Sequence, residues 1–261
     1  MTIKKSIARM VNRALSPFDA KVVAGWESNG EPGGGQGNPS ASSLRIRLFE
    51  QIRRKGFMPT HILDVGAHRG EWSRDAHKVF PESALTLIEP QTEMRPHLER
   101  FCSEAKNAHL IIAGAGASEG ELPFTVASRT DSSSFAFSEA DAEQWGVERR
   151  MVPVVTLDSV CEESTLPIPE MVKIDAEGLD LEVIKGSQKL IGVTELFFVE
   201  LPFFDYWTNQ SFHMIVAFMR ECGYEPYDIT DLNRRHSDGA LALMEVAFAK
   251  KAGVLRDHHG Y

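Results

Sequence analysis

The chain has 261 residues, enough for one sizeable domain with a short extension, because chains beyond about 250 residues usually divide into several domains. Its 43% hydrophobic and 25% charged residues are typical of a folded globular protein and exclude an intrinsically disordered one. A net charge of −9 disfavours a nucleic-acid partner, since nonspecific binding to phosphates needs a basic surface.

The first 43 residues are predicted to form an extension, and residues 44–261 the main domain. Apolar residues recur at helical spacing over 2–16, which predicts an amphipathic helix that ends at Pro17. This helix could contact a second copy of the chain or an anionic membrane surface, although packing on its own domain is more frequent for such helices. Residues 28–43 are rich in Gly, Ser and Pro and predict a flexible linker or a mobile flap.

Cysteine usage and hydrophobicity predict where the protein is located. The three cysteines lie far apart and suit neither a disulfide framework nor a zinc site. No apolar run is long enough to span a membrane or to serve as a signal-peptide core. We therefore expect a cytoplasmic protein without a transmembrane segment.

The main domain alternates short β-rich runs with helical patterns, which predicts a largely parallel sheet with helices on both faces. Strands are expected at residues 61–65, 84–89, 109–113, 171–175 and 195–201, and helices at 70–80, 91–104, 179–191 and 212–222. Two further extended runs are expected at 122–127 and 151–157, and a terminal antiparallel pair at 224–229 and 243–250.

A glycine-rich turn follows the first expected strand. It runs from Asp64 through Gly66 to Gly70, where a helix is predicted to begin. Glycine allows a tight turn and a close approach to a ligand, and the first N–H groups of a helix are free to bind it. Several nucleotide-binding folds use such a turn, and it can also be merely structural.

An acidic residue, Glu89, ends the second expected strand. A carboxylate at this point can accept hydrogen bonds from ribose hydroxyls, or it can simply be an exposed strand end. The glycine spacing between Gly66 and Gly70 is GxxxG, which differs from the GxGxxG of NAD-binding proteins. The pair of motifs therefore favours S-adenosylmethionine over a nicotinamide cofactor.

Charged residues gather at the end of the strand at 171–175. Asp175 could orient or deprotonate an acceptor hydroxyl, and Lys173 could stabilise a developing alkoxide or adjust the pKa of Asp175. Glu177 and Glu200 could support them, although a purely structural Lys–Asp pair would leave the same pattern. Asp175, Glu177 and Glu200 could also hold Mg²⁺ or Ca²⁺, but no separate ligand motif is present and a metal-free site is favoured.

The segments VKIDAEGLDLEVIKGS, ILDVGAHRGEWS and LIEP together resemble the FkbM-type methyltransferase family over about residues 44–250. The resemblance implies a Rossmann-like seven-stranded sheet with an antiparallel last strand, S-adenosylmethionine as methyl donor, and O-methylation of sugars, glycolipids or macrolide hydroxyls. It assigns the amino-acid half of the cofactor to the glycine turn and the ribose to Glu89. It places Ala117 and Ser118 near the adenine and Ser133 and Ser134 near the acceptor. The turn residues concerned are Asp64, Gly66, Ala67, His68 and Gly70.

The chain departs from the family pattern at two of these positions. Asn is common where this chain has His68, and an acidic residue is common where it has Ser118. We therefore expect an S-adenosylmethionine-dependent O-methyltransferase that acts on a sugar, a glycan, or a glycosylated or polyketide metabolite. The alternatives are an NAD(P)-dependent oxidoreductase on a similar fold and a non-catalytic homologue that binds the cofactor.

Overall fold

The structure is a computed structural model that describes residues 40–127, 133–204, 210–235 and 237–256. The predicted helix at 2–16 and most of the predicted linker lie outside these residues. Within the described part of the chain, no helix is long and apolar enough to cross a membrane.

The central sheet has seven strands in the order β3-β2-β1-β7-β8-β10-β9. Pairing is parallel from β3 to β8, whereas β10 runs antiparallel to both β8 and β9. The fold class predicted from the sequence is therefore confirmed. The strands are β1 (His61–Val65), β2 (Ala84–Ile88), β3 (Ala108–Ile111), β7 (Met171–Ile174), β8 (Leu196–Pro202), β9 (Tyr224–Arg234) and β10 (Leu241–Lys250).

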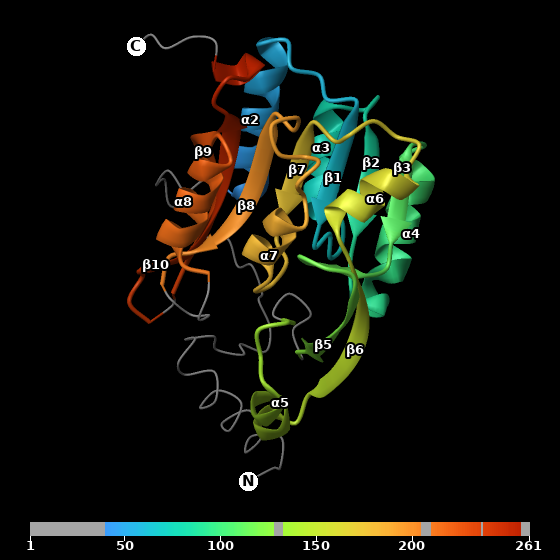
Figure 1. Cartoon of the computed structure of the whole chain (residues 1–261), viewed down its shortest axis with the longest axis vertical. Coiled ribbons are helices and arrows are strands. Elements are labelled where there is room, and N and C mark those ends of the chain that lie inside the picture. The colour runs from blue at the N-terminus through green and yellow to red at the C-terminus, as the bar shows by residue number, and fades with distance from the viewer. Residues whose placement is uncertain (1–39, 128–132, 205–209, 236, 257–261) are drawn as a thin grey trace, which may run out of the picture.

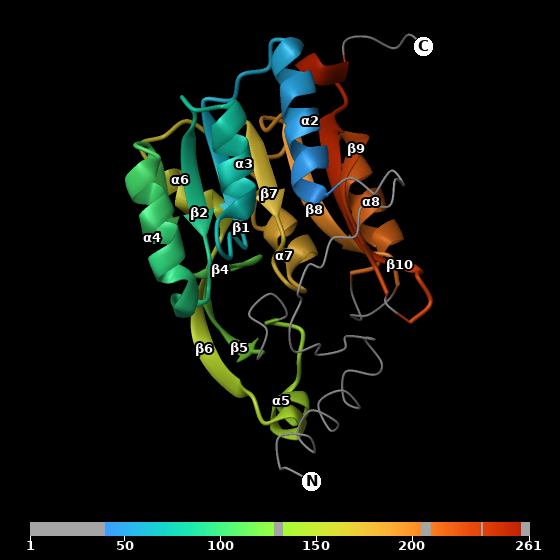
Figure 2. The same cartoon turned by 180° about the vertical axis from the view of Figure 1, so that it is seen from behind.

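Helices cover both faces of this sheet. Figure 2 shows α2 (Ala41–Arg54), α3 (Glu71–Val79) and α4 (Arg95–Glu104) on one face. Figure 1 shows α6 (Leu157–Glu163), α7 (Asp180–Lys185) and α8 (Phe212–Glu221) on the other. Each layer has its own apolar core, in which Phe49 and Trp72 represent the first face and Phe197 and Tyr224 the second. The described residues also include two short 3-10 helices, η1 (Thr92–Met94) and η3 (Val254–Arg256).

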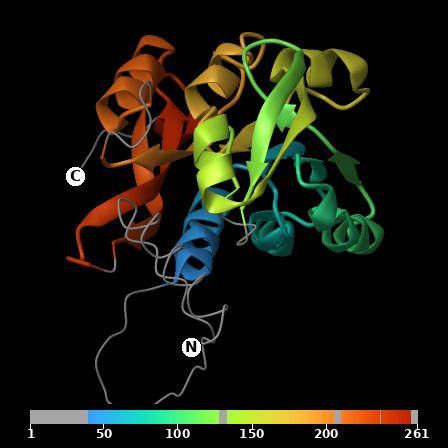
Figure 3. The same cartoon turned by 90° about the horizontal axis from the view of Figure 1, so that it is seen from below.

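A second, three-stranded sheet projects beyond the carboxyl ends of the parallel strands (Figures 1 and 3). It pairs β6 (Glu148–Val155) with β4 (Gly114–Ala115) on one side and with β5 (Gly120–Val126) on the other. Helix α5 (Glu139–Trp145) precedes β6 and lies at the far end of this unit. The ring of Phe135 packs on Phe124 and over Gly114, where a Cβ would meet it. Parallel strands end at a common edge, so this unit stands beside the edge where a ligand is expected.

Some predicted boundaries are wrong. Helix α2 was not predicted, and its cap Ser40 shows that residues 40–43 belong to a helix rather than to the linker. Helix α7 ends at Lys185 instead of running to 191. At the next residue, Gly186, the backbone lies so close to Gly116 that a Cβ would overlap its carbonyl oxygen, and the chain turns there. Helices α5 and α6 and strand β4 were also not predicted.

Candidate functional site

The glycine turn after β1 adopts a conformation that few residues tolerate. Gly66, His68 and Gly70 all have positive φ, at 72°, 47° and 77°. Asn, Asp and His are the non-glycine residues that enter this region most readily, so a histidine at position 68 is compatible with the turn. Gly70 is also the N-terminal cap of α3. The predicted strand–turn–helix arrangement is therefore present.

Asp64 lies beneath this turn and is fully buried. One of its oxygens accepts a hydrogen bond from the Ser73 hydroxyl at 2.6 Å, and the other lies 3.4 Å from the Lys173 ammonium. In this arrangement the carboxylate braces the turn from behind. A direct contact between Asp64 and the cofactor stays a prediction.

Glu89 follows β2 and faces the same turn. Its two carboxylate oxygens accept hydrogen bonds from the backbone N–H groups of His68 at 2.7 Å and Gln91 at 2.9 Å. Burial raises the pKa of Glu89, although these two hydrogen bonds oppose the shift. Each oxygen keeps a further lone pair for a ribose hydroxyl. Only 2% of Glu89 is exposed, and its contact with a ribose stays a prediction.

The other residues assigned to the cofactor differ in exposure. Ala67 is buried behind the turn, whereas Ala117 and Ser118 are exposed just after β4. The backbone of Ala117 lies against Gly186, at the end of α7. Both exposed residues are thus open to a ligand, and their role at the adenine stays a prediction.

Lys173 joins the turn after β1 to the end of β7. Its ammonium donates a hydrogen bond to the carbonyl of Gly66 at 2.7 Å and lies 3.2 Å from a carboxylate oxygen of Asp175. Burial alone would lower the pKa of Lys173, but the carboxylates of Asp175 and Asp64 raise it above its usual value. The lysine is therefore a fixed cation, and the side chain of Asp175 beside it is 33% exposed to solvent.

The segment after Asp175 forms a tight turn. Glu177 has a φ of 49°, and Gly178 a φ of 101°. The buried carboxylate of Asp180 accepts a hydrogen bond from the Ala176 N–H at 2.7 Å. Burial raises the pKa of Asp180 to about 6. Asp180 was not among the predicted site residues, although an acid six residues after the end of β7 was visible in the sequence.

Two carboxylates stand opposite each other on β8 and β10. Glu200 pairs in register with Glu245, and residues paired in this way project from the same face of a sheet. Glu245 is buried and accepts a hydrogen bond from the Thr230 hydroxyl at 2.6 Å. Within the described ranges, the side chain of Glu200 has no hydrogen bond or ion pair. Glu245 was not among the predicted site residues, although an acid within the apolar run LALMEVAFAK marked it in the sequence.

Burial raises the pKa of both carboxyl groups. It raises that of Glu200 well above the ordinary value, with help from the negative charges of Asp175, Glu177 and Asp180. It raises the pKa of Glu245 to about 7, although Arg45 opposes the shift. In the described part of the chain, no three His, Cys, Asp or Glu side chains are grouped so that they could hold a metal ion. Asp175, Glu177 and Glu200 thus form no metal site in this arrangement.

Ser133 and Ser134 brace the segment that leads to α5. The Ser133 hydroxyl donates to the side-chain oxygen of Gln91 at 3.2 Å, and that of Ser134 donates to the Glu177 carbonyl at 2.6 Å. Both residues are buried. Their hydroxyl groups thus link the loops after β2 and β7, and a contact with the acceptor stays a prediction.

The strand order, the glycine turn and the acid after β2 together define a Rossmann-like methyltransferase fold. The chain matches the model of the methyltransferase FkbM domain over residues 64–226. This match covers well over half of the chain, which therefore belongs to the FkbM methyltransferase family and is an S-adenosylmethionine-dependent methyltransferase.

Solved structures of other methyltransferases are similar, at low identity. A precorrin-6y C5,15-methyltransferase from Geobacter metallireducens GS-15 is 12% identical, with 79% of this chain and 87% of that one covered and a TM-score of 0.47. The N-terminal domain of EvdMO1 with bound S-adenosylhomocysteine is 12% identical, with 96% of this chain and 98% of that one covered and a TM-score of 0.47. A 1,6-didemethyltoxoflavin-N1-methyltransferase from Burkholderia thailandensis is 12% identical, with 81% and 78% covered and a TM-score of 0.44. No curated protein matches the chain.

Proposed function

We propose that the protein is an O-methyltransferase that acts on a hydroxyl of a sugar, a glycan, or a glycosylated or polyketide metabolite. The observation that carries this proposal is the partly exposed carboxylate of Asp175, held 3.2 Å from the buried ammonium of Lys173 at the end of β7. An oxygen acceptor must lose its proton during methyl transfer, and a positioned carboxylate can take it. The resemblance to the FkbM family favours the same class of acceptor.

Different residues at this edge of the sheet bind the cofactor, align the acceptor and remove its proton in this proposal. S-adenosylmethionine, when bound, supplies an electrophilic methyl group. Glu89 and the turn at Gly66 hold it, and the loop carrying Asp175 aligns the acceptor hydroxyl. Asp175 would accept the hydroxyl proton as the acceptor oxygen takes the methyl group, and S-adenosylhomocysteine would be the leaving group. Lys173 fixes the carboxylate and stabilises negative charge that develops on the acceptor oxygen.

Asp175→Asn tests this proposal. The change keeps the size of the side chain and removes the proton acceptor, so transfer of a labelled methyl group to a panel of hydroxylated acceptors should fall by about 10²- to 10⁴-fold. The affinity for S-adenosylhomocysteine, measured by calorimetry, should stay within about twofold, since Asp175 holds no part of the cofactor in this scheme.

Asp228→Asn on β9 is the matched control and should keep full activity. An Asp175→Asn enzyme with wild-type turnover would refute the role of Asp175. Saturable cofactor binding by the wild type without turnover on any acceptor would instead fit a non-catalytic homologue.

A further inference from the structure

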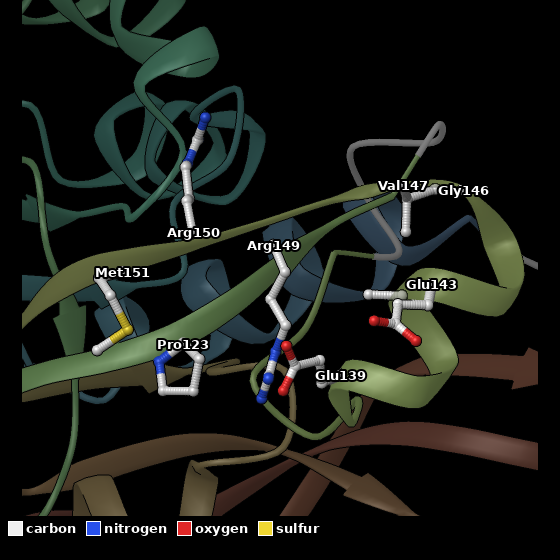
Figure 4. A pocket seen from close by; sticks show the side chains of 9 residues that line it. Pro123, Glu139, Glu143, Gly146, Val147, Arg149, Arg150 and Met151 are labelled. Atoms are coloured by element: carbon white, nitrogen blue, oxygen red, sulfur yellow. The ribbon is translucent and has the colours of Figure 1, made fainter.

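A cavity of about 350 Å³ lies between α5 and the β5–β6 hairpin (Figure 4). Its size falls within the range of small-molecule sites, which is roughly 300–1,000 Å³. Charged side chains of Arg149, Glu139 and Glu143 share its wall with the apolar side chains of Pro123 and Met151. None of these residues was assigned to the site described above.

Arg149 is the unusual member of this wall. Its Nε is buried and has no hydrogen-bond partner, and across the described residues its guanidinium forms no ion pair. The neighbouring Arg150 extends to the other side of the hairpin (Figure 4), where it binds Glu93 through two contacts of 2.7 and 2.6 Å. A buried donor without a partner costs free energy, which a ligand that accepts its hydrogen bond would recover.

Strand pairing links the wall of the cavity to the loop that carries Asp175. Arg149 pairs in register with Thr125, and Thr125 in turn pairs with Ser134. Directly opposite residues share one face of a sheet, so all three side chains point the same way. Two strand spacings, about 10 Å, separate Arg149 from Ser134. The Ser134 hydroxyl in turn contacts the carbonyl of Glu177, two residues after Asp175, so the cavity wall and the transfer site lie within the span of an acceptor of two or three rings.

The chemistry of the lining favours a polyhydroxylated ring over an anion. Arg149 offers donors and the carboxylates of Glu139 and Glu143 offer acceptors, which together suit hydroxyl groups that both donate and accept. Pro123 and Met151, the latter 55% exposed, provide an apolar surface for the C–H face of a ring. An anionic ligand would be repelled by the two carboxylates in the same cavity.

We propose that this cavity binds a sugar ring of the acceptor that is not itself methylated, with Arg149 as its main hydrogen-bond donor. This assignment rests on the proposed function, because it places part of a carbohydrate acceptor beside the transfer site. It makes Arg149 a residue that determines acceptor specificity rather than a catalytic residue.

Saturation-transfer NMR on the full chain, with S-adenosylhomocysteine present, tests the assignment without any turnover. The probes are methyl glycosides of hexoses and 6-deoxyhexoses, with methyl phosphate and sulfate as anionic comparisons. Arg149→Met keeps the length of the side chain and removes its donors, so glycoside binding should weaken at least tenfold. Arg53→Met, an exposed arginine on α2, is the matched control and should bind like the wild type.

Affinity for S-adenosylhomocysteine and the midpoint of urea unfolding, measured on the same proteins, should not change with Arg149→Met. These two readings separate loss of the subsite from loss of the fold or of the cofactor site. Glycoside binding that survives Arg149→Met would overturn the assignment. So would a wild-type protein that binds none of the glycosides, or one that binds only the anionic probes through Arg149. Failure of S-adenosylhomocysteine to bind would count against the proposed function instead.

Discussion

Lys173 and Glu245 show two ways in which this fold accommodates a buried ionisable group. Lys173 lies between the carboxylates of Asp64 and Asp175, so its charge is compensated and its pKa is raised. Glu245 has a neutral hydroxyl as its hydrogen-bond donor and faces Glu200 across the sheet. Burial raises the pKa of Glu245 to about 7, although Arg45 and the Thr230 hydroxyl oppose the shift, so the carboxyl group holds a proton at a pH where an exposed glutamate is ionised.

The raised pKa of Glu245 makes the stability of the protein depend on pH. The folded state binds this proton up to about pH 7, whereas the usual pKa of a glutamate is 4.5. Its contribution is fully present below pH 4.5, and it is lost as the pH rises through 7, because there the unfolded chain holds fewer protons than the folded one. Two to three pKa units correspond to roughly 3 kcal/mol.

Glu245→Gln should remove most of this dependence. In urea unfolding measured at intervals from pH 4.5 to 8, the free energy of unfolding should fall with rising pH more steeply for the wild type than for the variant. Glu121→Gln, an exposed site on β5, is the control and should follow the wild type. Parallel curves for the wild type and Glu245→Gln would show that Glu245 titrates normally.

At the scale of elements, the loops after β1 and β7 lie in close contact. A Cβ on Gly66 would overlap the carbonyl oxygen of Asp175, and Gly66 itself has a φ of 72°. The Lys173 ammonium bridges the same two loops through the Gly66 carbonyl. The turn that is predicted to hold the cofactor and the carboxylate that is predicted to accept the proton are therefore placed by one backbone contact.

Gly66→Ala should disturb both functions. The positive φ costs about 1 kcal/mol for alanine, and the overlap with Asp175 should add about 1–3 kcal/mol of destabilisation. Gly192→Ala is a matched control, because Gly192 has a φ of 79° but no neighbouring atom within 4 Å of the added Cβ. Urea unfolding and S-adenosylhomocysteine titration should show a larger loss for Gly66→Ala in both measurements. Equal losses would mean that the overlap is relieved without cost.

The sequence predicted the parallel strands well because each is a short apolar run, and polar residues after β1, β2 and β7 mark their carboxyl ends. The Gly66 turn, Glu89, Lys173 and Asp175 could be placed at one edge for the same reason. Helix α5 could have been found from its cap, where Ser138 and Asp141 form a capping box.

Other features depend on contacts between residues far apart in the sequence, and no local pattern reports them. The packing of Phe135 over Gly114 holds the second sheet in place. The pairing of Glu245 with Glu200 follows from the register of β10 on β8. The burial of Ser133 and Ser134 follows from their hydrogen bonds to loops about 40 residues away. The sequence therefore predicts that these two polar loop residues are exposed, whereas the structure shows them buried.

In the whole molecule, the antiparallel pair of β5 and β6 lies beside the carboxyl edge of the seven-stranded sheet (Figure 1). One face of the hairpin binds Glu93, after β2, through Arg150. The opposite face carries Arg149 and the cavity. The predicted cofactor side and the proposed acceptor side are thus opposite faces of a single hairpin.

The central claim is that this edge of the sheet binds S-adenosylmethionine rather than a nicotinamide cofactor. The most direct test is calorimetric titration of the metal-stripped protein with S-adenosylhomocysteine and, in parallel, with NAD, for the wild type and for Glu89→Ala. We predict saturable binding of S-adenosylhomocysteine, at least tenfold weaker in Glu89→Ala, and no binding of NAD. Binding of NAD without S-adenosylhomocysteine would contradict the claim.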